Sequence, residues 1–120
     1  MAIIGAHALL YTSEPEAVRD IFKDVFGFTH VDAGHGWLIF ALPPAELGVH
    51  PSDGTTFAEG VRHELALMCD DLEATVAELR AKGLDIPGEP QAAGWGMTTT
   101  IVLPGGLEMM LYQPRHALAI

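Results

Sequence analysis

Four ionisable side chains stand at matching places in two similar halves of this chain. Alternate residues of a strand face the same side, and by this rule one face of the expected sheet carries His7, Glu46, Glu64 and Glu108. Acidic side chains seldom line the inside of a sheet unless they are paired or bind a cation. Because imidazole and carboxylate groups bind divalent ions, these four residues are the predicted metal ligands. Glu64 and Glu108 are also the predicted catalytic residues, since a carboxylate there could shuttle a proton.

Other side chains near this face suit an organic ligand. The predicted ligand-binding residues are Trp37, His50, Trp95, Met110 and Tyr112. Aromatic rings offer flat apolar surface with a polar edge or tip, and Trp95 lies between two glycines in a loop that could close over a ligand. The alternative interpretation is that these rings simply fill a core.

An internal duplication gives these residues equivalent positions in the two halves of the chain. Residues 7–18 read HALLYTSEPEAV and residues 64–76 read ELALMCDDLEATV, so that His7 falls on Glu64 and Glu16 on Glu73. The halves end in similar words, ELGVHP at 46–51 and EMMLYQP at 108–114. A period of about half the chain predicts two copies of one supersecondary unit.

Each copy predicts a strand, a helix and three further strands. In the first copy the strands are 3–11, 28–32, 37–42 and 46–50, and the helix begins after an N-cap at Ser13 and ends at Gly27. In the second copy the strands are 64–69, a short or edge strand in 86–91, 98–103 and 107–113, and the helix, capped by Asp70 or Asp71, runs to Lys82.

The predicted fold class is therefore α+β, with two tandem βαβββ modules forming a cup-shaped curved sheet and helices on its outer face. Residues 1–52 form the first module, 53–60 the linker and 61–120 the second module of one structural domain.

Composition excludes some classes of partner. The net charge is −10 with only 6 Lys and Arg, which disfavours nucleic acid and anionic membrane surfaces. No apolar run approaches the ~20 residues that span a bilayer, the N-terminus lacks the basic region of a signal peptide, and Cys69 is the single cysteine. We therefore expect a cytoplasmic protein without nucleic-acid or membrane partners. The acidity itself favours solubility or a pocket for a cation.

The chain resembles the vicinal oxygen chelate superfamily, which includes glyoxalase I, extradiol dioxygenases, fosfomycin-modifying enzymes and bleomycin-resistance proteins. The similar segments are HALLYTSEPEAVRDIFKDVFGF, ELALMCDDLEATVAELRAKGLD and LPGGLEMMLYQPR, which together span nearly the whole chain. The resemblance implies paired βαβββ modules, a cup-shaped site and a homodimer. It places His7 and Glu64 at first-strand ligand positions, but it aligns Gly48 and Met110, rather than Glu46 and Glu108, with the last-strand ligands.

Two functions follow as hypotheses. The leading one, implied by the resemblance, is a glyoxalase- or dioxygenase-like enzyme that acts on a small oxygen-chelating substrate through a divalent Fe, Mn, Ni or Zn ion. The alternative is a metal-free protein that sequesters a cationic or aromatic small molecule, as bleomycin-resistance proteins do. A third hypothesis is that the protein is a structural remnant that binds no ligand.

Overall fold

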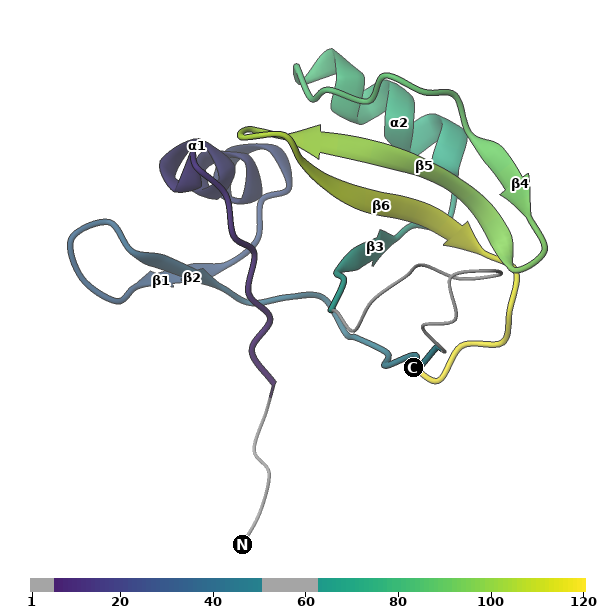
Figure 1. The fold of residues 1–120 in the computed structure, drawn as a ribbon, viewed down its shortest axis with the longest axis horizontal. Coiled ribbons are helices and arrows are strands. Elements are labelled where there is room, and N and C mark those ends of the chain that lie inside the picture. The colour runs from purple at the N-terminus through teal and green to yellow at the C-terminus, as the bar shows by residue number, and fades with distance from the viewer. Residues whose placement is uncertain (1–5, 51–62) are drawn as a thin grey trace, which may run out of the picture.

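The computed structural model describes residues 6–50 and 63–120 and confirms the α+β class with a curved sheet (Figure 1). The second half shows the predicted βαβββ order: β3 (Ala66–Met68), α2 (Leu72–Ala81), β4 (Gln91–Ala93), β5 (Gly96–Leu103) and β6 (Leu107–Pro114). These strands form one sheet in the order β3-β6-β5-β4, in which β3 runs parallel to β6 and the other neighbours are antiparallel. Helix α2 covers one face of this sheet and leaves the other face open.

Helix α2 begins and ends where local chemistry requires. Asp71, rather than Asp70, is the N-cap, and its carboxylate accepts a hydrogen bond from the Ala74 N–H at 3.1 Å. Gly83 follows the helix with a φ of 89°, a conformation that costs glycine little. The buried stripe of Leu72, Val76 and Leu79 faces the sheet. At 10 residues α2 is far too short for a bilayer, and no helix in the described part of the chain is long and apolar enough to cross one.

Burial along β5 and β6 confirms the predicted two faces. Ile101, Leu103, Met109 and Leu111 are buried in the core under the helices. The intervening residues of β6, Glu108, Met110 and Tyr112, are exposed or half-buried. Because side chains alternate along a strand, these three residues stand on the open face of the sheet.

The first half forms a helix and a hairpin. Helix α1 (Pro15–Asp20) continues as a π-helical turn, η1 (Ile21–Val25), and ends before Gly27, as predicted. The hairpin pairs β1 (His30–Asp32) with β2 (Leu38–Phe40) in antiparallel register. The buried ring of Phe22 packs against the rings of Phe26, Phe28 and Phe40, with centroids 5.0 to 5.7 Å apart, so helix and hairpin share one aromatic core.

Several local predictions were wrong. Residues 6–11 and 46–50 form no strand with any described part of the chain, so the first module shows its helix and only two of its four strands. Ser13 does not cap α1. The N-cap position is Glu14, whose side chain makes no capping bond, and the Thr12 hydroxyl accepts from the Glu14 N–H instead.

Strand β4 begins only at Gln91, since prolines within 86–91 cannot donate to a ladder. The predicted linker, 53–60, lies outside the described residues, and the module boundaries stay predictions.

Candidate functional site

An aromatic cluster lies on the open face of the sheet, where β6 ends. Tyr112, near the end of β6, meets Trp95 of the β4–β5 turn in an edge-to-face contact, with ring centroids 5.2 Å apart and planes at 80°. His116, just beyond β6, places its ring 6.0 Å from the Tyr112 ring. Such edge-to-face contacts hold rings in fixed orientations, so the three residues present a defined polar–aromatic surface.

Hydrogen bonding orients the side chains of this cluster. The Nδ1 of His116 lies 2.9 Å from the Ala117 carbonyl oxygen, which can only accept, so Nδ1 is the donor of this bond. Its Nε2 then accepts from the Tyr112 hydroxyl at 3.3 Å. Tyr112 is therefore a hydrogen-bond donor on this face.

Glu46 brings negative charge to the same place. It comes from the first half of the chain, is half-buried, and accepts a hydrogen bond from the Ala119 N–H. Burial raises the pKa of the Tyr112 phenol, and the Glu46 carboxylate raises that pKa further. The phenol thus stays neutral beside a carboxylate, and both groups can interact with a polar, cationic ligand.

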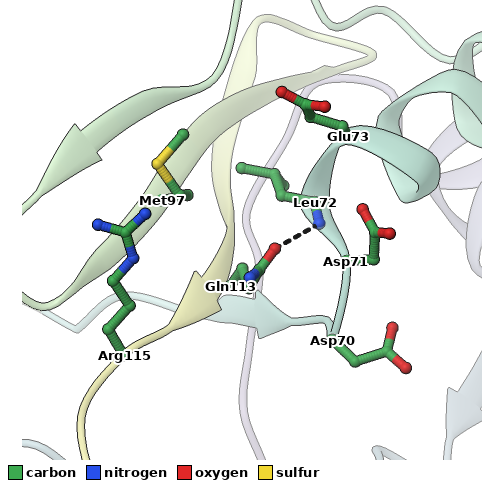
Figure 2. Close-up of a pocket in the computed structure, with 7 residues that line it drawn as sticks. All are labelled: Asp70, Asp71, Leu72, Glu73, Met97, Gln113 and Arg115. Carbon is green, nitrogen blue, oxygen red and sulfur yellow. Dashed lines mark hydrogen bonds between the residues drawn. The ribbon is translucent and has the colours of Figure 1, made fainter.

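Two neighbouring pockets open beyond this cluster, where β3 leads into α2. Figure 2 shows the first, of about 330 Å³, with Asp70, Asp71 and Glu73 on the helix side and Met97 and Arg115 opposite. Between them the Gln113 side-chain oxygen accepts from the Leu72 N–H at 2.9 Å.

The second pocket, of about 370 Å³, shares Asp70 and Gln113 with the first and is further lined by Met68, Cys69, Pro114 and Leu118. Burial raises the pKa of the Cys69 thiol, which keeps it protonated. The first pocket lies on the helix side of the sheet, because Gln113 and Met97 alternate with Tyr112 and Thr98. Met68 of the second pocket shares instead the face of its register partner, Tyr112.

The predicted metal ligands are dispersed along the single chain. Glu64 and Glu108 are exposed; Glu108 lies on β6, whereas Glu64 lies two residues before β3 begins at Ala66, which pairs with Met110. Glu46 lies instead beside Tyr112, and His7 is exposed in the segment before α1. Among residues 6–50 and 63–120, no three His, Cys, Asp or Glu side chains are arranged to hold a metal ion. The metal assignment stays a prediction.

The predicted ligand-binding residues divide into two groups. Tyr112 and Trp95 are in contact, and Met110, two residues before Tyr112, shares its face. Trp37, by contrast, lies under the Arg19 guanidinium, which sits 4.6 Å from its ring centre. The β1–β2 hairpin and the β4–β5 turn are at opposite sides of the molecule (Figure 1). His50 is exposed with its ring close to Gly48.

Sequence reasoning missed His116, Gln113 and Arg115. The first lies beyond the last predicted strand, where no periodicity assigns a face. The signal that could have found it is its spacing of four residues from Tyr112, an aromatic already assigned to the site.

Comparison with known proteins gives one family and a set of similar structures. The model of the glyoxalase/bleomycin resistance protein/dioxygenase superfamily matches residues 5–111. The chain is 27% identical to the solved structure of TnmS3, an antibiotic binding protein from Streptomyces sp. CB03234, covering 95% of this chain and 98% of that one with a TM-score of 0.65.

It is 16% identical to the lactoylglutathione lyase of Agrobacterium tumefaciens, covering 93% and 92% of the two chains with a TM-score of 0.61, which shows the shared fold alone. Comparison with curated proteins finds no match.

Proposed function

Because the chain belongs to the glyoxalase/bleomycin resistance protein/dioxygenase superfamily, we propose that it binds and sequesters a small molecule with aromatic and cationic character on the open face of its sheet. The observation that carries the proposal is the contact of Trp95 with Tyr112 beside the carboxylate of Glu46. Small-molecule sites combine apolar and aromatic walls with a few polar groups that orient the ligand, and this cluster offers both.

The chemistry of the cluster selects the kind of ligand. Aromatic rings attract a cation over their faces, by about 0.5–1 kcal/mol when exposed and ~2 kcal/mol when desolvated. The Glu46 carboxylate favours positive charge at the same place, and the neutral phenol of Tyr112 can exchange a hydrogen bond. A net charge of −10 draws cations toward the protein and repels anions. A flat cation therefore suits the site better than a flat anion.

The similarity to TnmS3 supports this proposal. That protein is an antibiotic binding protein, and it is 27% identical to this chain over almost the full length of both. A protein that only binds a small molecule needs a complementary surface and no catalytic group.

The test is equilibrium dialysis with two probes that share one ring system, 9-aminoacridine as the cation and acridine-9-carboxylate as the anion. We expect binding of the cation and little binding of the anion. Trp95→Ala and Glu46→Gln should each weaken binding of the cation by about tenfold, the equivalent of ~1.4 kcal/mol. The matched control is Glu78→Gln on α2, which removes the same charge from an exposed ion pair with Lys82. Equal loss in Glu46→Gln and Glu78→Gln would show that only the overall charge matters.

A metal-dependent enzyme is the second candidate, and the placement of Glu108 on β6 and of Glu64 just before its partner strand β3 favours it. A divalent ion would be held by His7 and Glu64 with Glu46 or Glu108, and it would act as a Lewis acid toward a substrate with two oxygen ligands. Among residues 6–50 and 63–120, the single chain does not gather these side chains into a metal-binding group.

Metal analysis of protein purified without chelator tests this candidate. A stoichiometric ion lost in His7→Ala supports the enzyme. A metal-free protein whose melting temperature does not respond to Ni²⁺, Mn²⁺ or Zn²⁺ rejects it, since a ligand that binds the native state raises its stability.

A further inference from the structure

The last residues of the chain fold back over the aromatic cluster and form what we call the strap, residues 115–120. The Arg115 N–H donates to the Trp95 carbonyl oxygen at 2.9 Å. His116 accepts from the Tyr112 hydroxyl, and the Ala119 N–H donates to the Glu46 carboxylate. The strap thus already engages the Tyr112 hydroxyl and the Glu46 carboxylate, and it bonds to the backbone of Trp95 while leaving the Trp95 ring against Tyr112.

His116 occupies this place with a flat nitrogen heterocycle. Its imidazole packs beside the Tyr112 ring and shares a hydrogen bond with the phenol, while a backbone N–H of the same strap satisfies Glu46. We infer that the strap is an internal stand-in for the ligand, and that a ligand binds by displacing it. The inference rests on the proposed function and defines its ligand as a planar nitrogen heterocycle that exchanges a hydrogen bond with Tyr112 and directs positive charge toward Glu46.

The strap is built to be displaced. All of its residues are exposed, and Leu118, its apolar anchor in the second pocket, is 51% exposed. Exposed hydrogen bonds exchange for bonds to water at little net cost, and segments with few buried contacts open most readily.

A competing strap reduces the apparent affinity to the intrinsic affinity multiplied by the fraction of molecules in which the site is open. Two variants loosen it in different ways. His116→Ala removes the imidazole, and Ala119→Pro removes the N–H that donates to Glu46 without touching the ring cluster. We expect each to bind 9-aminoacridine about threefold to tenfold more tightly than the wild type. The control is His35→Asn, which removes an imidazole from the β1–β2 turn at a φ of 54° that asparagine tolerates, and which should leave affinity unchanged.

A second measurement follows the strap itself. In the probe-saturated wild type, the His116 ring-proton signals should move to the positions of a histidine without a neighbouring aromatic ring, because the ring has left Tyr112. Weaker binding in His116→Ala would make His116 a ligand contact and overturn the inference. Unchanged affinity in both variants, with the wild type still binding the probe, would also overturn it while leaving the proposed function intact. Failure of the wild type and both variants to bind would reject the proposed function, and the inference with it.

Discussion

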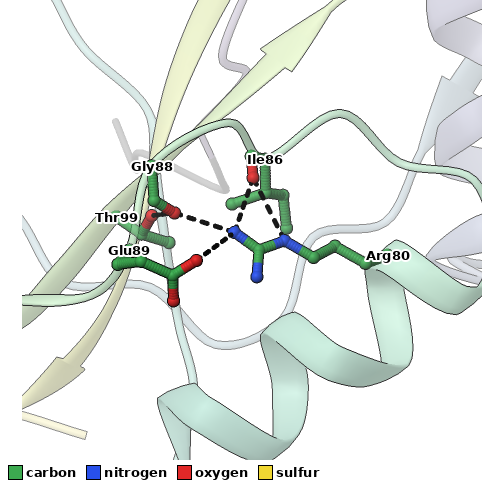
Figure 3. A network of polar contacts seen from close by, with 5 residues as sticks. All are labelled: Arg80, Ile86, Gly88, Glu89 and Thr99. Carbon is green, nitrogen blue, oxygen red and sulfur yellow. Dashed lines mark hydrogen bonds and ion pairs between the residues drawn. The ribbon is translucent and has the colours of Figure 1, made fainter.

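At the scale of single residues, Arg80 organises the loop that follows α2 (Figure 3). Its guanidinium donates two hydrogen bonds to the Ile86 carbonyl oxygen, at 3.1 and 2.7 Å, and one to that of Gly88 at 2.9 Å. Its contact with the Glu89 carboxylate, at 3.4 Å, is largely exposed and contributes little. The value of Arg80 therefore lies in its bonds to the backbone of the loop.

We expect Arg80→Ala to lower the free energy of unfolding by about 1–2 kcal/mol, the range for partly exposed charge-assisted hydrogen bonds. Urea denaturation measures this loss. Arg80→Lys should recover little of it, since an ammonium group lacks the fork that spans two carbonyls. Lys82→Ala is the control, because it removes only an exposed ion pair with Glu78. Such a pair contributes a few tenths of a kcal/mol, roughly 0.3–0.5 kcal/mol, to stability. Equal losses in Arg80→Ala and Lys82→Ala would contradict the role given to Arg80.

Tyr112 offers a titration test of the site. In a Tyr11→Phe background it is the remaining tyrosine of two, so its ionisation can be followed by ultraviolet absorbance. Its pKa lies above the ordinary value because of burial first and of Glu46 second. Glu46→Gln should therefore lower this pKa part of the way toward the ordinary value, and Glu78→Gln should not change it.

The sign of the effect on stability follows. As the pH rises, the Tyr112 phenol loses its proton in the unfolded chain before it does so in the folded chain. The contribution of the protonated phenol to the free energy of unfolding is therefore fully present at neutral pH and is lost as the pH rises through the tyrosine range. If Glu46→Gln left the titration unchanged, Glu46 would not lie beside Tyr112 in solution.

At the scale of elements, the N-terminus of α2 depends on one carboxylate. Asp71 accepts from the Ala74 N–H, whereas Asp70 lines the first pocket without capping the helix. Asp71→Ala should cost about 1 kcal/mol of unfolding free energy, measured by thermal or urea denaturation. Asp70→Ala serves as the matched control and should cost much less. A larger loss from Asp70→Ala would show that the cap has been assigned to the wrong residue.

The second half of the chain could be predicted from sequence because its signals are local. Alternation along 107–113 separates Met109 and Leu111 from Met110 and Tyr112, and the cap, stripe and terminal glycine define α2. The first half could be predicted only in part. Its outer segments, 6–11 and 46–50, have strand-like sequences, but a strand forms only where another edge offers hydrogen bonds. Likewise, strand parity, on which the prediction for Glu46 rested, could not show that this residue contacts the strap, whose course depends on tertiary packing.

At the scale of the whole molecule, the unpaired segments of the first half leave apolar side chains in water. Leu9 is 64% exposed, Tyr11 81%, Leu47 90% and Val49 86%. The duplication shows how such residues are used: Met109 and Leu111, the counterparts of Leu47 and Val49, are 2% and 3% exposed in the second half. Grouped exposed apolar residues and open strand edges mark surfaces that pair with another chain. Each copy of this chain carries both the segments and, among residues 6–50 and 63–120, an edge at β3 without a further strand beside it, as a two-fold symmetric pair requires.

We therefore expect a homodimer in which these segments are covered. Light scattering at micromolar concentrations should give twice the mass of one chain, 12.8 kDa. Replacing both Leu47 and Val49 with Lys should shift the equilibrium toward the monomer, because burying two unpaired ammonium groups opposes association. The control is Ala77→Lys on the exposed side of α2, which should leave the dimer intact. Circular dichroism separates loss of association from loss of folding, since α2 and the β5–β6 hairpin do not depend on Leu47 or Val49. A wild-type protein that remains a monomer over this range would contradict the dimer, and the exposed residues would then have to be covered within one chain.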